Sequence, residues 1–297
     1  MDVRAWVLLF SGGLGCASAG RVSPAAEPTV EARLRSAPPV PLEVTVDSSA
    51  PARGVVVDEL SFRGAGDGAR RVTATRVRPA GSGPFAALLW VHWLGEPATT
   101  NRTEFLAEAV ELAGHGVVSL LVDAMWSATK WYGQRVPKED FDASLRQAQD
   151  LIRALDLLAA EKGVDPSRIG FVGHDYGAMH GILAGGADRR PCAWVLVAAT
   201  PRFSDWAFFG PKPKDEAAYR TRIATLDPLV FIGQLNGAVL LQFATRDEYI
   251  PKQAADALAA AAPAGARVQT YDADHSVDVA PARVDREAFL RATLGLR

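Results

Sequence analysis

The stretch IGFVGHDYGAM, residues 169–179, carries the most informative pattern in this 297-residue chain. Its first part is apolar, as expected of a strand that is buried on both faces. Gly173 and Gly177 then flank a short turn with Asp175 at its centre, and small apolar residues follow in a pattern that favours the start of a helix. The order predicts a strand, a sharp turn and a helix, with Asp175 presented at the carboxyl end of the strand.

Around this stretch, short apolar runs alternate with helical patterns, which is typical of a largely parallel sheet covered by helices on both faces. The fold class is therefore α/β, with an eight-stranded, mostly parallel sheet. The expected strands are Val55 to Phe62, Val72 to Val77, Ala86 to His92, Val117 to Asp123, Ile169 to Gly173, Trp194 to Ala198, Val239 to Thr245 and Val268 to Tyr271. The first two are expected to form a hairpin at the edge of the sheet. The expected helices span about 102–113, 139–161, 252–261 and 286–294.

The composition bounds the class of protein. With 48% hydrophobic and 22% charged residues, the chain can bury a large core, and its length fits a single α/β domain. The formal net charge of -2, without a block of Lys or Arg, gives no reason to expect nucleic acid as a partner. The expected ligand is a small-molecule substrate. The sequence has no Gly-rich phosphate loop and no dinucleotide motif, so we expect no cofactor.

Three histidines, His92, His174 and His180, lie close to the central turn or to a neighbouring strand end. Their spacing matches no common set of metal ligands, and no cysteine accompanies them. The sequence therefore predicts no metal site, and we expect these side chains to be buried in the core or to support the site indirectly.

The N-terminus resembles a secretory signal peptide, because a basic start and a short apolar run precede the pattern Ala17-Ser18-Ala19. Residues 1–19 are predicted to be removed on export to the periplasm or the medium, and lipidation at Cys16 is an alternative. A third interpretation is a disordered or mis-started N-terminus. The apolar run is too short to span a bilayer, so no transmembrane segment is expected in the mature chain.

Residues 20–53 are rich in Pro, Ala and Ser and show little periodicity, which predicts an extended linker or a loosely docked arm. The folded domain is then expected to span 54–297. Since Cys192 is the only cysteine after residue 19, no internal disulfide can form in the mature chain. The sequence does not predict an oligomeric state.

Two inserts, 124–137 and 200–235, follow predicted strand ends, where open α/β sheets carry their binding clefts. Both are rich in aromatic residues. They form either a packed side lobe or, as we expect, a lid that walls an apolar pocket. The residues expected to line this pocket are Trp126, Tyr132, Trp206 and Tyr219 from the inserts and Trp93 from the loop after Ala86 to His92.

The turn GHDYG, residues 173–177, resembles that of epoxide hydrolases and haloalkane dehalogenases, in which the central Asp is the nucleophile. Residues 86–95, 240–251 and 272–275 instead resemble the dienelactone hydrolase and acyl-esterase branch of the same superfamily. Together these resemblances cover most of the chain from residue 55 onwards. They imply the α/β-hydrolase fold with short lid inserts.

The resemblance also implies catalytic roles. The superfamily order of nucleophile, acid and histidine matches Asp175, Asp247 and His275. His275 would then be the general base, and Asp247 would orient its ring and stabilise its charged form. The adjacent Glu248 is an alternative acid, and only the geometry can decide between the two.

The residues after the strand Ala86 to His92 resemble the oxyanion loop of these families. The resemblance implies that the backbone N–H of Leu94, or alternatively of Trp93, pairs with the N–H of Tyr176 to hold an oxyanion. The side chain of Trp93 is expected either to pack in the core or to line the cleft, where its indole N–H would contact a leaving group.

An aspartate at the turn favours displacement at an sp3 carbon. Opening an epoxide or expelling a halide gives an alkyl ester of Asp175, which water activated by His275 can hydrolyse, whereas attack on a carbonyl would give a mixed anhydride. The expected substrate is a small apolar epoxide or haloalkane. For an epoxide the acid would be Tyr132 or Tyr219, and for a haloalkane the N–H donors would be Trp93 and Trp126.

Two other functions stay open. One is a carboxylic ester hydrolase of the dienelactone hydrolase type, in which Asp175 acts as a base for attack by water. The other is a catalytically inactive binding protein. An inactive site predicts that Asp175 is paired to a neighbour and sealed from the cleft. An enzyme predicts that it faces a cavity within hydrogen-bond reach of His275.

Overall fold

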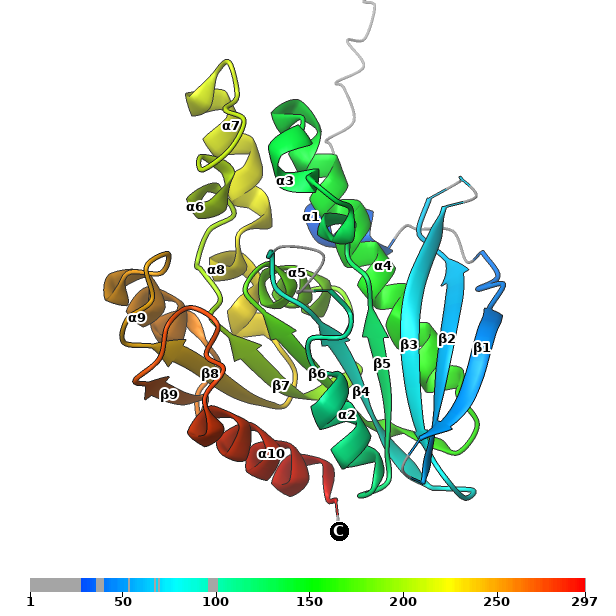
Figure 1. Cartoon of the computed structure of the whole chain (residues 1–297). Helices are drawn as coiled ribbons and strands as arrows, with labels where there is room; N and C mark the ends of the chain where they lie inside the picture. Colours follow the sequence, from blue (N-terminus) through cyan, green and yellow to red (C-terminus); the bar gives the residue numbers. More distant parts are fainter. Residues whose placement is uncertain are drawn as a thin grey trace, which may run out of the picture.

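A computed structural model of the chain (Figure 1) describes residues 28–35, 40–52, 54–66, 68, 70–95 and 101–296. The predicted signal peptide, residues 1–19 with Cys16, lies outside these residues and stays a prediction. In the part that is described, no helix is both long enough and apolar enough to cross a membrane.

Over the described residues a nine-stranded sheet forms the centre of the molecule, in the order β1-β2-β3-β5-β4-β6-β7-β8-β9. The strands are β1 (Thr45–Ala52), β2 (Val55–Arg63), β3 (Arg71–Pro79), β4 (Phe85–Val91), β5 (Val117–Val122), β6 (Val164–His174), β7 (Pro191–Val197), β8 (Ala238–Ala244) and β9 (Arg267–Tyr271). The pairs β1-β2, β2-β3 and β3-β5 are antiparallel, and every pair from β5 to β9 is parallel. The predicted mostly parallel α/β sheet is confirmed.

Helices cover both faces of this sheet. They are α1 (Val30–Arg35), α2 (Leu106–Ala113), α3 (Trp131–Gln134), α4 (Asp140–Ala160), α5 (Tyr176–Gly185), α6 (Ser204–Ala207), α7 (Glu216–Ile223), α8 (Pro228–Phe231), α9 (Lys252–Ala261) and α10 (Ala280–Leu294). Helices α4 and α5 pack together against the central strands, and α2 and α10 contact the sheet from its other face (Figure 1). The sheet between these two layers holds the core.

The central strands are buried because their sequences are apolar throughout. Strand β5 reads VVSLLV and is buried along its whole length, as is β4 beyond its first residue. A strand covered on both faces has no position for an exposed polar side chain, which explains why these runs do not alternate. The predicted strands and long helices were found close to their expected limits, except that β6 begins five residues and α10 six residues earlier than expected.

Strand β1 is the ninth strand, one more than predicted. Its sequence, TVDSSAPA, has no apolar face and contains Pro51, which is tolerated only where a backbone N–H is not needed. The strand is exposed at the edge of the sheet, where β2 is its one partner among the described strands. The predicted edge position of the β2-β3 hairpin is therefore wrong, because β1 covers β2 and β5 pairs with β3.

The described part of residues 20–53 contacts the rest of the fold. Helix α1 packs against α4, where the Arg33 guanidinium donates a hydrogen bond to Asp142 over 2.8 Å and Leu34 is buried. Strand β1 extends the sheet. The predicted boundary between an arm and a domain at residue 54 stays a prediction.

The two inserts meet above the carboxyl ends of the parallel strands (Figure 1). The first follows β5 and contains α3, and the second follows β7 and contains α6, α7 and α8. The Arg135 guanidinium donates a hydrogen bond to the carbonyl oxygen of Pro211 over 3.0 Å, and the Tyr132 hydroxyl donates one to the carbonyl oxygen of Trp206. These contacts join the two inserts over one edge of the sheet.

Candidate active site

The turn between β6 and α5 has the strained geometry that its sequence predicted. Asp175 has φ 51° and ψ −116°, a conformation that is costly for a residue with a side chain. Its backbone N–H donates to the carbonyl oxygen of Val197 over 2.7 Å, which ties the turn to the end of β7. Helix α5 begins at the next residue, so Asp175 stands at the carboxyl end of β6.

The two glycines of this turn are required by close packing. A Cβ atom on Gly177 would lie 2.5 Å from the carbonyl oxygen of Val91, and one on Gly173 would lie 2.7 Å from the backbone nitrogen of Ala178. Both distances are well inside van der Waals contact. The glycines therefore let α5 approach both β6 and the end of β4.

The carboxylate of Asp175 is fully buried, with 0% of the residue exposed. Its Oδ2 accepts a hydrogen bond from the backbone N–H of Leu94 over 3.1 Å. Its Oδ1 has no hydrogen-bond partner among the described residues. One oxygen of the carboxylate is thus held by the loop that was predicted to supply an oxyanion donor, and the other is unpaired.

His275 lies in the loop between β9 and α10, and Asp247 fixes its ring. The Nδ1 atom is 2.9 Å from Oδ2 and 3.0 Å from Oδ1 of Asp247. Asp247 is itself held by the backbone N–H groups of Tyr249 and Ile250, each 2.9 Å from its Oδ1. The neighbouring Glu248 is exposed. The geometry therefore selects Asp247 as the partner of His275.

His275 also lies beside Asp175, with Nε2 4.0 Å from Oδ2. Burial disfavours the charged imidazole, but the carboxylates of Asp175 and Asp247 outweigh it and raise the pKa of His275 to about 9. Burial likewise opposes ionisation of Asp247, and attraction to His275 nevertheless lowers its pKa. His275 is consequently an imidazolium at neutral pH.

Aromatic side chains surround His275. The ring centroids of Trp93, Trp206 and Tyr249 lie 5.5, 5.6 and 5.0 Å from that of His275. Two of these, Trp93 and Trp206, were predicted as pocket residues. Tyr249 was not, although it lies only two positions after Asp247 and on the same loop. The indole N–H of Trp206 is buried and has no partner among the described residues.

Three other predicted pocket residues have their polar atoms turned elsewhere. Trp126 is buried, and its indole N–H donates to the carbonyl oxygen of Trp93 over 2.9 Å. The Tyr132 hydroxyl binds the carbonyl oxygen of Trp206, and that of Tyr219 donates to Asp140 over 2.7 Å. None of these three groups is directed at Asp175 in this structure.

The backbone N–H groups predicted to form an oxyanion hole have different partners. The backbone N–H of Trp93 donates to Oε2 of Glu104 over 2.9 Å, so this group is already engaged. The N–H of Leu94 is the one that faces Asp175. Tyr176, whose N–H was expected to complete the pair, is buried and begins α5 directly after Asp175.

The buried histidines have separate partners. His92 contacts the carbonyl oxygen of Trp93 through Nδ1, and its Nε2 accepts from the backbone N–H of Ala124 over 3.3 Å. His180 donates through Nδ1 to the carbonyl oxygen of Tyr176 over 2.8 Å, and burial lowers its pKa to about 4. In the described part of the chain, no group of three or more His, Cys, Asp or Glu residues is arranged to hold a metal ion.

Solved structures share the overall fold of this chain. Acetyl xylan esterase 1 from Thermoanaerobacterium sp. JW/SL YS485 superposes with a TM-score of 0.72 and 14% identity, over 88% of this chain and 92% of that one. An acetyl xylan esterase from Paenibacillus sp. R4 gives 0.69 and 18%, over 90% and 92%. The chain has the α/β-hydrolase fold. The fold predicted from the sequence is thereby confirmed.

The α/β-hydrolase fold is shared with a candidate dienelactone hydrolase from Klebsiella pneumoniae subsp. pneumoniae MGH 78578, with a TM-score of 0.58 and 17% identity over 81% of this chain and 98% of that one. No protein-family model matches the sequence, and no curated protein matches it. At these identities the likeness concerns the fold alone. The chemistry must be argued from the site.

Proposed function

We propose that this protein is a hydrolase in which Asp175 displaces a leaving group from an sp3 carbon of a small apolar substrate, a haloalkane or an epoxide. One observation carries the proposal. Three buried polar atoms without a hydrogen-bond partner among the described residues, Oδ1 of Asp175, Nε2 of His275 and Nε1 of Trp206, belong to neighbouring side chains. Since an unpaired buried polar group is costly, such a cluster is explained best by a reaction that uses all three.

In the first step, Oδ1 of Asp175 attacks the substrate carbon. A bond forms between this oxygen and the carbon, and the bond to the leaving group breaks, so that the leaving group departs with the electron pair. The N–H of Leu94 fixes Oδ2, which directs the unpaired Oδ1 towards the substrate. The product of this step is an alkyl ester of Asp175.

In the second step, the charge state of His275 changes. Esterification removes the negative charge of Asp175, which is one of the two carboxylates that raise the pKa of His275. The imidazolium then releases its proton to solvent more readily, and the neutral imidazole can take a proton from water. The resulting hydroxide attacks the ester carbonyl, and the Leu94 N–H holds the oxyanion. The bond to the alkoxide then breaks, the imidazolium gives the alkoxide its proton so that the alcohol leaves, and the carboxyl of Asp175 passes its proton to His275, which restores both groups.

The available donors favour a halide as leaving group. An alkoxide needs an acid, but the hydroxyls of Tyr132 and Tyr219 are engaged with Trp206 and Asp140. A halide needs only N–H donors in an apolar setting, and the buried Trp206 N–H has no partner among the described residues. The predicted donor Trp126 is engaged elsewhere, so Trp206 takes its place in this proposal.

The burial of Asp175 bears on an inactive site as well. Asp175 is covered and its Oδ2 is paired with the Leu94 N–H, as an inactive protein predicts. At 4.0 Å, Nε2 of His275 lies beyond the hydrogen-bond reach that an enzyme predicts, and the observation that favours an enzyme is the unpaired Oδ1. Substrate must displace aromatic side chains such as Trp206 and Tyr249, which surround His275. This requirement favours small apolar substrates.

Trapping the covalent intermediate tests the proposal. The variant His275→Gln is incubated with 1-bromobutane, 1-chlorohexane, styrene oxide and p-nitrophenyl acetate, and its intact mass is measured. Without a base, the alkyl ester should accumulate, adding the alkyl group of a haloalkane or the whole mass of an epoxide. The double variant Asp175→Asn/His275→Gln should gain no mass. His115→Gln, which changes a histidine in the turn before β5, is the matched control and should turn over like the wild type.

Each outcome decides between the candidate functions. A mass gain that requires Asp175 supports displacement, and its size identifies the substrate class. Ester turnover by the wild type without any adduct from haloalkanes or epoxides would overturn the proposal in favour of ester hydrolysis. The absence of both an adduct and turnover would favour a binding protein.

A further inference from the structure

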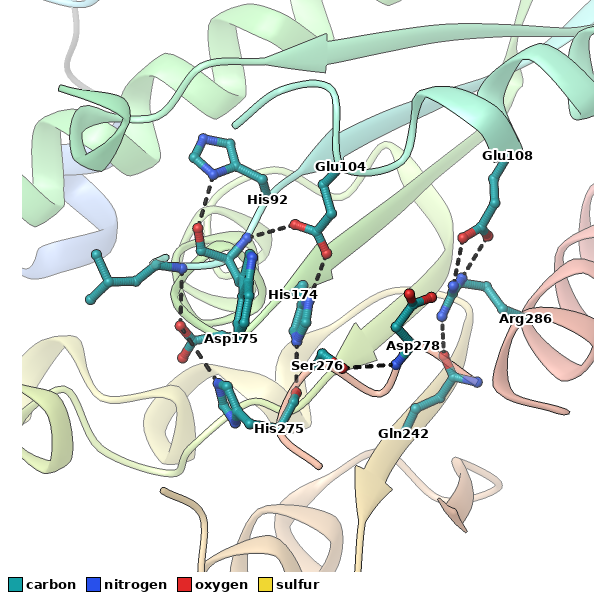
Figure 2. Close-up of polar contacts among 12 residues, drawn as sticks. His92, Glu104, Glu108, His174, Asp175, Gln242, His275, Ser276, Asp278 and Arg286 are labelled. Atoms are coloured by element: carbon teal, nitrogen blue, oxygen red, sulfur yellow. Dashed lines mark hydrogen bonds and ion pairs between the residues drawn. The ribbon is translucent and has the colours of Figure 1, made fainter. Parts of the chain in front are cut away.

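Hydrogen bonds link the oxyanion loop to the loop that carries His275. The backbone N–H of Trp93 donates to Oε2 of Glu104 over 2.9 Å, and Oε1 of Glu104 lies 2.6 Å from Nδ1 of His174. On the other side of its ring, Nε2 of His174 lies 3.1 Å from the carbonyl oxygen of His275. Figure 2 shows Glu104, His174 and His275 in line beside Asp175. We call Glu104 and His174 the bridge.

The bridge joins four separate segments of the chain. Trp93 follows β4, Glu104 precedes α2, His174 ends β6, and His275 follows β9. Because a carbonyl oxygen can only accept, Nε2 of His174 must carry the hydrogen in its contact with His275. The ring of His174 also stacks on that of Trp93, with centroids 5.1 Å apart and planes 8° apart. Its orientation is therefore fixed by packing and by both nitrogens.

The atoms that the bridge holds are adjacent to those that the reaction uses. Trp93 immediately precedes Leu94, whose N–H contacts Asp175. The carbonyl oxygen held by His174 belongs to His275 itself, whose Nε2 lies 4.0 Å from Asp175. A shift of either loop would move a reacting group relative to Asp175.

We propose that Glu104 and His174 are positioning residues, which hold the Leu94 amide and the His275 imidazole at fixed positions relative to Asp175. The inference rests on the proposed function, because it assigns both residues to the same reaction. Neither residue touches the reacting atoms in this role. Sequence reasoning placed His174 only as a buried or supporting histidine and did not identify Glu104.

The charged side chains near the bridge do not compete with Trp93 and His174 for Glu104. A cavity of about 390 Å³ borders Trp93, Glu104 and His174. The other charged side chains that line it pair with each other, Glu108 with Arg286 and Asp278 with Arg283. Figure 2 shows Glu108 and Arg286 apart from the bridge. The cavity also offers space for a small carboxylate beside residue 104.

Chemical rescue distinguishes positioning from general support of the fold. Glu104→Ala should lower kcat about 100-fold, the loss expected when reacting groups move by about 1 Å, with little change in KM. Sodium formate should restore much of this activity by occupying the cavity in place of the carboxylate, and sodium chloride at equal ionic strength should not. Glu104→Gln, which keeps the side-chain volume, covers the case in which the alanine variant does not fold. Glu111→Ala, an exposed glutamate of α2, is the matched control and should keep wild-type kcat.

A readout without turnover separates this inference from the proposed function. In Glu104→Ala, hydrogen exchange at the Leu94 amide should accelerate, and the NMR signals of the His275 ring should shift, in the absence of any substrate. If these signals and kcat match the wild type, or if formate and chloride act alike, the bridge does not position the site. If the signals change while no substrate yields an adduct in the trapping experiment, the bridge stands and the proposed function fails.

Discussion

Nε2 of His275 lies 4.0 Å from Oδ2 of Asp175, a distance at which opposite charges attract without a hydrogen bond. The other ring nitrogen contacts Asp247. Against the effect of burial, these two carboxylates raise the pKa of His275 to about 9. A serine in place of Asp175 would leave only one of them, so the aspartate raises the pKa of the histidine further than a serine would.

The variant Asp175→Asn should therefore lower the pKa of His275 by about 1 to 3 units, the usual effect of one close opposite charge. An NMR titration of ¹⁵N-labelled histidine side chains measures this pKa. Asparagine retains the shape of the side chain but has no charge. An unchanged midpoint in the variant would show that Asp175 does not set the charge of His275.

The same pKa predicts how stability depends on pH. Since the pKa of His275 is about 9 in the folded protein and about 6.5 when unfolded, its protonation stabilises the fold fully below about pH 6.5. This contribution is lost as the pH rises through 9. We expect the His275-linked part of the free energy of unfolding to decline over that window, and to decline less in Asp175→Asn. Urea unfolding at a series of pH values measures both slopes.

Gly177 should not tolerate a side chain. Alanine at this position would bring its Cβ to 2.5 Å from the carbonyl oxygen of Val91, and neither backbone can yield easily. We expect Gly177→Ala to reduce the free energy of unfolding by about 1 to 3 kcal/mol, as overpacking does. The control is Gly133→Ala in α3, where no atom lies within 4 Å of the added Cβ. Similar stability of both variants in urea would contradict the close packing at the turn.

Local patterns predicted the turn at Asp175 well. The strand, the flanking glycines and the helix start are contiguous, so their geometry follows from residues 169–179 alone. Asp175, Asp247 and His275 lie together, because each follows a strand of the same parallel sheet. A parallel sheet brings the carboxyl ends of its strands to one edge, and a sequence can predict which residues follow those ends.

The directions of side chains in the inserts could not be predicted in this way. Trp126 and Tyr132 lie in the expected segment, but their polar atoms bind the carbonyl oxygens of Trp93 and Trp206. Such contacts depend on how two distant loops pack. Glu104 is a similar case, because its partners Trp93 and His174 come from other segments. No periodicity marks a residue whose role arises from tertiary contacts.

The buried Arg286 should depend on Glu108. The guanidinium donates two hydrogen bonds to this carboxylate, over 2.6 and 2.8 Å, and a third to Gln242. Glu108→Ala leaves a charge that is 4% exposed without its counter-ion, so we expect a loss of about 3 kcal/mol in the free energy of unfolding. Glu287→Ala, which removes the partly exposed ion pair with Arg291, should cost less than about 0.5 kcal/mol. Equal losses measured in urea would show that Arg286 is stabilised without Glu108.

The sequence left both Asp247 and Glu248 as the possible acid partner of His275. The structure predicts that a substitution at Asp247 impairs turnover and that one at Glu248 does not. Asp247 contacts Nδ1 of His275 through both oxygens, so Asp247→Asn removes the charge that orients and stabilises the imidazolium. We expect turnover to fall by about 10²- to 10⁴-fold, the range for disabling a general base. Glu248 is exposed, so Glu248→Gln should stay within about twofold of the wild type.

The reaction step that Asp247→Asn slows provides a second test of this prediction. In the proposed mechanism, attack by Asp175 needs no base, whereas hydrolysis of the alkyl ester needs His275 as one. The variant should therefore accumulate the covalent adduct during turnover, visible by intact mass, while Glu248→Gln should not. Slow turnover of Asp247→Asn without any adduct would mean that Asp247 acts before the ester forms. Accumulation in Glu248→Gln instead would transfer the role of the acid to Glu248.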